Sequence, residues 1–506
     1  MRRKNKMGKL LIGWAEESIV PEKKVSLAGQ FFERISEYVE SEITVTAMAV
    51  QADGDEMIMV SADVVKVEDT LLQMARDKFA KLTSEVNPNK LMVAATHSHT
   101  SLKLAPPDTY KKQGDLTTVK ILSEFLPEGK EYKELVTPDE NVITPVEGAE
   151  FLTDKIALAA KKAWDNRAEG YYANEFGRAA VGMCRRVSYD DGSAQMWGDT
   201  NTANFVAMEG GNDSGIELIY TFDKNKKLTG VVANIACPAQ ILEQRSFISA
   251  DYWGRAKAIV REKLGQDVFM LGLCGAGGDQ CPRDLVRWVN PETPIDDPNV
   301  KRPNLLKRKA DPSMYDVSGC NRAGKRIANE IVSVYEEITE LKEEAIFKHK
   351  VIKLDLPLRK ATMAEYEHAV RELEYYIDKN KDKASFNFED NARMHVHAGT
   401  IMRYRMQQNT EIYPIELHVV RFGDISMVTN PFELFLDYGN RIKARSYSEQ
   451  TFIVQLCCGG GAYLPTEKAE RAGHYSAYIS SGYVGHEGGD LLVRESIKEI
   501  NEMWEM

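Results

Sequence analysis

The alternation of short apolar, β-branched runs with stretches of helical spacing most constrains the fold of this chain. Residues 43–50 and 56–63 alternate as strands do and flank an Asp-Gly turn, which predicts two paired strands. Residues 71–82 have helical spacing, and the apolar run at 91–95 is typical of a buried strand. Similar patterns continue without an internal repeat or an obvious linker. We therefore expect an α/β fold, a single large mixed-sheet domain over residues 1–506 that is flanked by helices.

Three stretches are predicted as insertions into this domain. Residues 103–147 are polar, contain proline and are weakly periodic. They are either a lid over the functional site or a surface insertion without a role. Residues 283–312 are rich in Pro, Asp, Arg and Lys and are predicted as an irregular insertion. Residues 361–408 contain two helical patterns and are predicted as a helical insertion.

Polar or glycine-rich segments follow several of the apolar runs directly. Open α/β sheets keep their chemistry in the loops beyond the ends of strands, so we expect these segments to meet at one edge of the sheet. They are residues 96–100, 237–240, 274–282, 430–433 and 458–463.

The first of these segments contains His97 and His99, separated by one serine. Alternate side chains of an extended chain share a face, so both can converge on one metal ion or one substrate. The alternative is a pair of polar loop residues that satisfy hydrogen bonds. A second such pair, His395 and His397, falls within a helical pattern, where residues two apart face in nearly opposite directions. We expect a structural or rim role for that second pair.

The glycine-rich loop at 275–279 could stabilise an oxyanion through its backbone N–H groups, or it could be a tight turn. It lacks the spacing of phosphate-binding loops, so nucleotide binding is not expected. Asp279 could orient a ligand, although capping of a helix is the commoner role. Cys281 could act as a nucleophile with His97 or His99 as its base, but no familiar cysteine signature surrounds it.

The composition excludes several classes of partner. Lysine and arginine total 65 against 76 acidic residues, and a net charge of −11 disfavours nucleic acid. No apolar run is long enough to cross a bilayer, so membrane insertion is not expected. The seven cysteines include no CxxC pair, which indicates reduced thiols in a cytoplasmic protein. A small-molecule substrate is the expected partner, and the sequence leaves a homo-oligomer open.

Taken together, the loops resemble the catalytic domain of the neutral/alkaline, non-lysosomal ceramidase family. Each motif is weak alone, but their order and spacing along most of the chain are specific. The similarity is carried by Val60-Ser-Ala-Asp63, Ala95-Thr-His-Ser-His99, Arg185-Arg186, Ile248-Ser-Ala-Asp251, Cys274-Gly-Ala-Gly-Gly-Asp279 with Pro282, Pro431-Phe-Glu433 and Gly461-Ala-Tyr-Leu-Pro-Thr466.

The resemblance implies a neutral-ceramidase-like fold that holds one divalent metal ion, with zinc expected. It nominates His97, Glu433 and Tyr463 as ligands. The family's second zinc histidine should lie in the segment before Ile248, but residues 234–240 contain none. Either of two residues could replace it, Cys237 as a thiolate or Gln240 through its weaker oxygen; the site could also hold another metal or none.

The resemblance also places His99 near the metal or the substrate and Arg185 in contact with the substrate. Cys281 stands in a loop where the family has a serine. The chain is expected to lack the β-sandwich domain that follows the catalytic domain in ceramidases, so a soluble, polar substrate is expected rather than a long-chain ceramide.

These observations lead to a predicted metal-dependent amidohydrolase that cleaves a linear amide in a soluble N-acyl compound. His99 would be the general base, and Tyr463 would stabilise the oxyanion. Arg185 would hold a polar or anionic group of the substrate. A carbohydrate-active hydrolase or lyase is the first alternative, because Trp197, Tyr252 and Trp253 could suit a sugar. A metal-free binding protein is the second.

Overall fold

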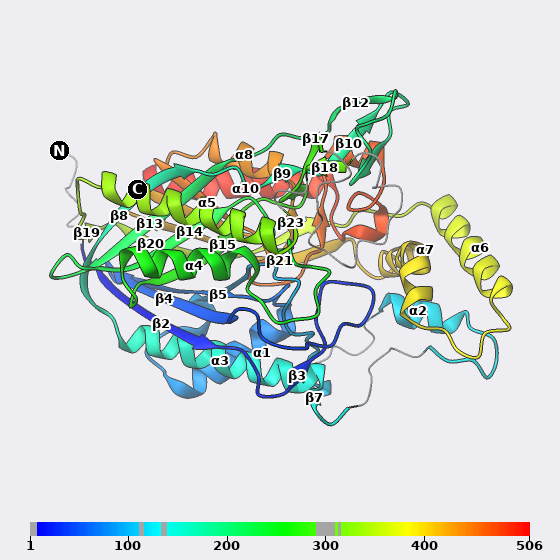
Figure 1. The fold of residues 1–506 in the computed structure, drawn as a ribbon, viewed down its shortest axis with the longest axis horizontal. Coiled ribbons are helices and arrows are strands. Elements are labelled where there is room, and N and C mark those ends of the chain that lie inside the picture. The colour runs from blue at the N-terminus through cyan, green and yellow to red at the C-terminus, as the bar shows by residue number, and fades with distance from the viewer. Residues whose placement is uncertain (1–7, 111–115, 133–138, 290–308, 312–314, 506) are drawn as a thin grey trace.

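The computed structural model describes residues 8–110, 116–132, 139–289, 309–311 and 315–505. Its largest element is an eight-stranded sheet in the order β15-β14-β13-β8-β2-β4-β5-β6 (Figure 1). The β5–β6 and β14–β15 pairs are parallel and the other pairs are antiparallel, so the sheet is mixed, as predicted. The strands are β2 (Leu11–Ser18), β4 (Thr44–Ala52), β5 (Asp55–Ala62), β6 (Leu91–Ala95), β8 (Ala168–Arg178), β13 (Gly215–Asp223), β14 (Leu228–Ile235) and β15 (Phe269–Cys274).

A second sheet of four strands packs against the first. Its order is β20-β21-β22-β24, and buried residues of both sheets, such as Val60 and Met92 in the first and Val420 and Phe452 in the second, belong to one apolar core. Side chains of this kind each contribute about 1.5–3 kcal/mol when buried. The strands are β20 (Phe347–Pro357), β21 (Ile412–Phe422), β22 (Ile425–Thr429) and β24 (Gln450–Val454).

Helices cover the outer faces of the two sheets (Figure 1). Helix α3 lies against β2, β4 and β5 and packs beside α1, while α4 and α5 pack together at the β13–β15 end of the sheet. Helices α8 and α10 cover the second sheet. No helix within the described ranges is long and apolar enough to cross a bilayer. The helices are α1 (Asp69–Leu82), α3 (Pro145–Asp165), α4 (Asp251–Leu264), α5 (Asp316–Glu337), α8 (Leu436–Lys443) and α10 (His486–Glu505).

Two of the predicted insertions pack against each other at one end of the molecule. Helix α2 (Thr118–Glu124), from the 103–147 stretch, lies against α7 (Phe388–Met406), which pairs with α6 (Met363–Lys379). Ile121 and Leu373 are buried in their small shared core. The ends of the 283–312 stretch pair as β17 (Asp284–Val289) and β18 (Lys309–Asp311). Residues 111–115, 133–138, 290–308 and 312 of these stretches lie outside the described residues, and the lid role of 103–147 stays a prediction.

The structure departs from the sequence patterns in two places that matter for the site. Residues 431–445 have helical spacing in the sequence, but the helix begins only at Leu436, because the preceding residues are extended and pair with the segment at Tyr463. The long strands β8 and β20 were not predicted, since polar or charged residues occupy many of their positions and both are only partly buried.

Candidate functional site

The predicted loops meet beyond the ends of strands from both sheets, β6, β14 and β15 of the large sheet and β22 and β24 of the second, and backbone hydrogen bonds join each loop to a neighbour. Ala239 N–H donates to Thr96, which joins the 237–240 segment to the His97 loop, and Gly278 N–H donates to Leu434 O. Glu433 N–H donates to Ala462 O. Five segments that are far apart in sequence therefore form one continuous surface, as a site at a sheet edge requires.

His97 is held in a conformation that is unusual for a residue with a side chain. Its φ is 66°, in the left-handed region, and such strain is concentrated at functional positions. Its Nδ1 is hydrogen-bonded to Val65 O at 2.9 Å, and its Nε2 lies 3.7 Å from Oε2 of Glu433. Burial and the nearby His99 lower the pKa of His97 well below its ordinary value, so the imidazole is neutral and Nε2 is available as a ligand.

Glu433 and Tyr463 are brought side by side by a short parallel pairing. The strands β23 (Glu433–Leu434) and β25 (Tyr463–Leu464) place these two residues opposite each other. Burial raises the pKa of Glu433, although the charge of Arg185 and a hydrogen bond with Tyr463 act in the opposite direction. A buried carboxylate with too little compensating charge is well suited to a cation.

His99 lies beside His97, with 4.7 Å between the ring centroids. Within the described residues neither of its buried ring nitrogens has a hydrogen-bond partner, although Nδ1 lies 3.4 Å from Oε2 of Glu243. Burial opposes ionisation of Glu243, but His99 and Arg185 outweigh it and lower its pKa. Gly29 packs on the imidazole, and a Cβ at that position would lie 2.5 Å from its Cγ.

Glu243 was not found by sequence reasoning. It lies in a polar turn after Gln240 and belongs to no motif, so only the tertiary structure places it beside His99. Buried polar atoms without partners are rare, and those of His99 are available to a substrate or to water.

Arg185 is buried at the floor of the site. Its Nη2 donates to Gly278 O at 2.9 Å and lies 3.4 Å from Oη of Tyr463, while its Nε has no hydrogen-bond partner among the described residues. The neighbouring Arg186 is instead fully engaged, since it forms a two-bond ion pair with Glu209. Of the two arginines, Arg185 therefore has the donor capacity for a ligand.

Cys237 and Gln240 lie on the loop next to His97, and the His99 N–H donates to the backbone of this loop at Ala239. The Cys237 thiol is fully buried and 3.7 Å from the carbonyl of Pro238, and burial raises its pKa well above the ordinary value. A metal ion would have to displace that proton before the sulfur could bind. Their roles as ligands stay predictions.

Asp279 and Cys281 lie deeper than the histidines. The Asp279 carboxylate accepts a hydrogen bond of 2.9 Å from the Leu436 N–H and so caps α8, while burial raises its pKa to about 6. The Cys281 thiol is 3.5 Å from the carbonyl of Arg283, and burial raises its pKa to about 12. A thiol with a raised pKa is a weak nucleophile. The catalytic roles of both residues stay predictions.

Two of the three aromatic residues considered for sugar binding are inaccessible. Tyr252 and Trp253 are fully buried at the start of α4, so neither can stack on a sugar. Trp197 lies nearer the site, with its ring 6.0 Å from the guanidinium of Arg185 and 5.2 Å from that of Arg283.

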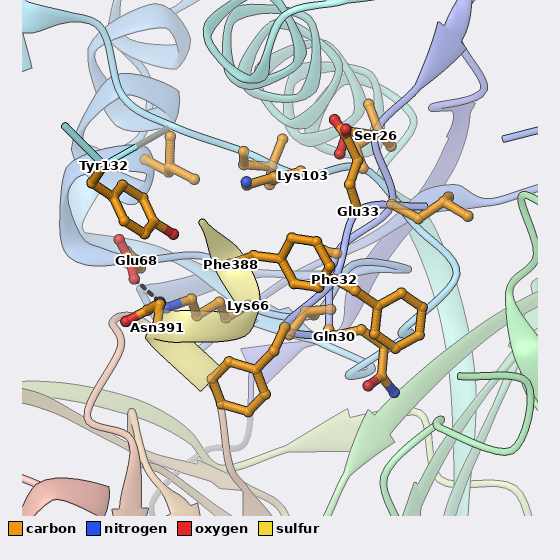
Figure 2. Close-up of a pocket in the computed structure, with 18 of the residues that line it drawn as sticks. Ser26, Gln30, Phe32, Glu33, Lys66, Glu68, Lys103, Tyr132, Phe388 and Asn391 are labelled. Carbon is orange, nitrogen blue, oxygen red and sulfur yellow. Dashed lines mark ion pairs between the residues drawn. The ribbon is translucent and has the colours of Figure 1, made fainter. Parts of the chain in front are cut away.

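A cavity of about 450 Å³ lies beside the His97 loop. Its wall includes Val65, which binds His97, and Gly29, which packs on His99. Figure 2 shows Phe32 and Phe388 among its lining residues, together with an ion pair between Lys66 and Glu68. Lys103 and Tyr132 complete a lining that is both aromatic and charged.

A second cluster of metal-ligating side chains lies outside this site. The ligand atoms of Glu416, His418 and Cys458 all lie within 4.8 Å of one another. Across the described part of the chain, no other group of three His, Cys, Asp or Glu side chains meets this distance. At the first site His97 and Glu433 therefore depend on a different residue type, such as Tyr463, or on a movement to complete a ligand set.

Comparison with known structures identifies the fold. The neutral ceramidase from Pseudomonas aeruginosa superimposes with a TM-score of 0.66 and 12% sequence identity, over 99% of this chain and 75% of that one. The chain has the neutral ceramidase fold. A structure described as ceramidase complexed with C2 agrees, with a TM-score of 0.65 and 11% identity over 99% and 76% of the two chains. No protein-family model and no curated protein matches the sequence.

The neutral-ceramidase fold confirms the resemblance and the mixed α/β architecture expected from the loop motifs. At 11–12% identity the likeness concerns the fold alone. Activity, substrate and metal must be argued from this chain's own residues.

Proposed function

We propose that this chain is a metal-dependent hydrolase that cleaves an amide bond in a small N-acyl compound. The observation that carries the proposal is the approach of His97 Nε2 to the buried Glu433 carboxylate at 3.7 Å, beside the ring nitrogens of His99, for which the described residues provide no hydrogen-bond partner. Buried groups without partners persist where a ligand or a reaction needs them.

The residues present fit a divalent cation at this position. His97 offers a neutral nitrogen and Glu433 a carboxylate whose charge is poorly compensated, while Tyr463 supplies a phenol oxygen as the third ligand beside them. Zinc is the preferred candidate because it accepts nitrogen and oxygen ligands together. When bound, the ion would supply Lewis-acid chemistry by polarising a carbonyl and lowering the pKa of water.

His99 is proposed as the general base. With Nδ1 directed to Glu243, Nε2 can take a proton from the attacking water and return it to the leaving amine. Glu243, whose Oε2 lies 3.4 Å from Nδ1, would fix the orientation of the ring. Gly29 leaves the space that the ring needs.

Tyr463 and Arg185 are proposed to act on the substrate carbonyl and on a polar group next to it. Burial raises the pKa of Tyr463, so its phenol keeps its proton. A neutral phenol that offers a lone pair to the cation can still donate its O–H to the oxygen that becomes negative in the tetrahedral intermediate. The guanidinium, with its unused Nε, can hold a carboxylate or a hydroxyl of the substrate. The cavity bounded by Phe32 and Phe388 would receive the acyl part.

The test combines metal analysis with product analysis. The purified chain, loaded with zinc and freed of excess ion, should hydrolyse members of a panel of N-acyl amino acids and N-acyl amino sugars and release the free amine. Removal of zinc with a chelator should abolish turnover, and zinc should restore it. Full activity in the metal-free protein would contradict the proposal. Binding of these compounds without turnover would favour a binding protein instead, and turnover without a released amine would favour a carbohydrate-active enzyme.

A further inference from the structure

The cluster around His418 is separate from the proposed catalytic residues. Its side chains come from the four-stranded sheet and from the loop after β24, whose backbone is bonded to β6 of the eight-stranded sheet. We propose that Glu416, His418, Cys457 and Cys458 form a second, closed metal site for zinc or a similar thiophilic divalent ion, which fastens the four-stranded sheet to the eight-stranded one. This inference does not depend on the proposed amidase activity.

The four side chains come from two segments of the second sheet. Glu416 and His418 are two residues apart on β21, where alternate side chains share a face. Their side chains touch, with 2.6 Å between Nε2 of His418 and Oε1 of Glu416. Cys457 and Cys458 follow the end of β24, and the Cys458 sulfur completes the group within 4.8 Å.

The spacing of the two sulfurs matches a shared metal. The Sγ atoms of Cys457 and Cys458 are 3.7 Å apart, and both cysteines are free thiols. Two thiolates bound to one tetrahedral zinc at about 2.3 Å each would be separated by about 3.8 Å. The distance between the two sulfurs therefore needs little change, whereas a disulfide would require an approach to about 2.05 Å. Cys457 lies outside the group of three whose ligand atoms are within 4.8 Å, so its sulfur would have to move toward Glu416 and His418.

A chain of hydrogen bonds behind His418 presents its Nε2 to the cluster. Nδ1 of His349 is 3.0 Å from the carbonyl of Glu56, which can only accept. A neutral His349 therefore accepts at Nε2, which lies 2.8 Å from Nδ1 of His418. His418 thus carries a proton on Nδ1. Its Nε2 points to the Glu416 carboxylate at 2.6 Å and donates to it, so a metal ion would take the place of that one proton. Such an outer partner is the usual support of a ligating histidine.

Arg76 supplies the charge that the site requires. Its guanidinium donates to both oxygens of Glu416, at 3.0 and 2.6 Å, and also to Leu91 O. With two thiolates, one carboxylate, a divalent ion and Arg76, the formal charges cancel. A neutral sum matters because His418 and Cys458 are buried and an uncompensated charge there would be costly.

The position of the two cysteines shows which parts of the molecule such a site would connect. The Cys458 N–H donates to Val93 O in β6, and Cys457 bridges to Ala94 in the same strand. Strand β6 leads directly to His97, and the chain beyond Cys458 leads to Tyr463. A metal here would fix the two segments that lead to His97 and Tyr463. With four protein ligands it would have no open coordination position, as in structural zinc sites.

The test uses the full chain loaded with cobalt(II), whose thiolate complexes absorb strongly in the near ultraviolet. The wild type should bind about two equivalents, one for each site, and show this thiolate-to-cobalt band. The double variant Cys457→Ser/Cys458→Ser should lose the band and about one equivalent. Glu433→Ala should lose the other equivalent and keep the band, so the two sites can fail independently. Cys237→Ser, a buried thiol outside the cluster, should also keep the band.

Two results would overturn the inference. One is a cobalt-loaded wild type without the thiolate band, and the other is a band that disappears in Cys237→Ser but persists in the double variant. Should the double variant not fold, X-ray absorption of cadmium-loaded Glu433→Ala decides the matter, because only the second site would then be filled. Two sulfur neighbours support the inference, and a shell of nitrogen and oxygen alone contradicts it.

Discussion

Two histidine clusters in this molecule differ in how completely their polar atoms are satisfied. The open cluster, His97 and His99 with Glu433, lies on loops beyond the strand ends, and the ring nitrogens of His99 have no hydrogen-bond partner in the described parts of the chain. The closed cluster, His349 and His418 with their neighbours, lies on strands and forms a continuous hydrogen-bonded chain. Because unsatisfied groups cost stability and satisfied ones do not, the first cluster is expected to serve activity and the second to serve stability.

Glu433→Ala in the open cluster is expected to have the largest effect, and it tests whether this cluster serves activity and not stability. Loss of a metal ligand should lower kcat/KM by at least about a thousandfold, because several kcal/mol of transition-state stabilisation disappear with the ion. The free energy of unfolding of the metal-free protein should stay the same or rise, since a poorly compensated buried carboxylate is removed. Kinetics and urea unfolding of the same preparation measure both. Retained activity would remove Glu433 from the site.

Arg76→Met is the matching change in the closed cluster. It leaves Glu416 partly buried without its cation, which should lower the free energy of unfolding by about 3 kcal/mol. Lys360→Met is the control, because the ion pair of Lys360 with Glu411 is exposed and its loss should leave the unfolding midpoint unchanged. An equal effect of both variants would show that the closed cluster adds no special stability.

Asp279→Asn tests whether Asp279 takes part in catalysis with the open cluster or only caps α8. The pKa of Asp279 in the folded protein, about 6, lies above its ordinary value of 3.8, so folding favours the protonated form. The stabilising contribution is complete below pH 3.8 and is lost as the pH rises to about 6.

The variant should therefore be more stable than the wild type by about 1–3 kcal/mol at pH 7, since Asn can still accept from Leu436. The difference should vanish near pH 4, as thermal unfolding across this range would reveal. An activity loss of more than about tenfold would instead assign Asp279 to the chemistry.

Gly29→Ala should have the smallest effect, and it tests whether activity depends on the position of the His99 ring. A methyl group there meets the imidazole, so kcat should fall about tenfold through misplacement of the base. Gly54→Ala is a matched control, because Gly54 also has a positive φ but has no atom within 4 Å of the added Cβ. Both variants should lose some stability through backbone strain, and only Gly29→Ala should lose activity.

Much of the open cluster could be predicted from the sequence because its residues follow apolar runs in recognisable loops. His97, Glu433 and Tyr463 all lie where polar segments interrupt strands, and the structure brings them together. Glu243 could not be found in this way, since its only relation to His99 is tertiary.

The closed cluster has one feature that is visible in the sequence, the spacing of Glu416 and His418 by two residues. Glu416 and His418 alternate on a single strand and so face the same side, yet they lie within an apolar pattern that predicts only a strand. Charged residues likewise hid the strand character of β20, from which His349 comes. Patterns of hydrophobicity locate strands well but do not show which polar side chains of two strands will meet.

The cap that Asp279 provides to α8 has a consequence for how the molecule assembles. Helix α8 has only eight residues, and its first free N–H group is satisfied by a side chain 157 positions earlier in the chain. So short a helix is marginal alone, and closing so long a loop is entropically costly. We therefore expect α8 and the neighbouring Glu433 segment to become ordered late in folding, after the glycine-rich loop has docked. The proposed catalytic site would then be the last part of the protein to form.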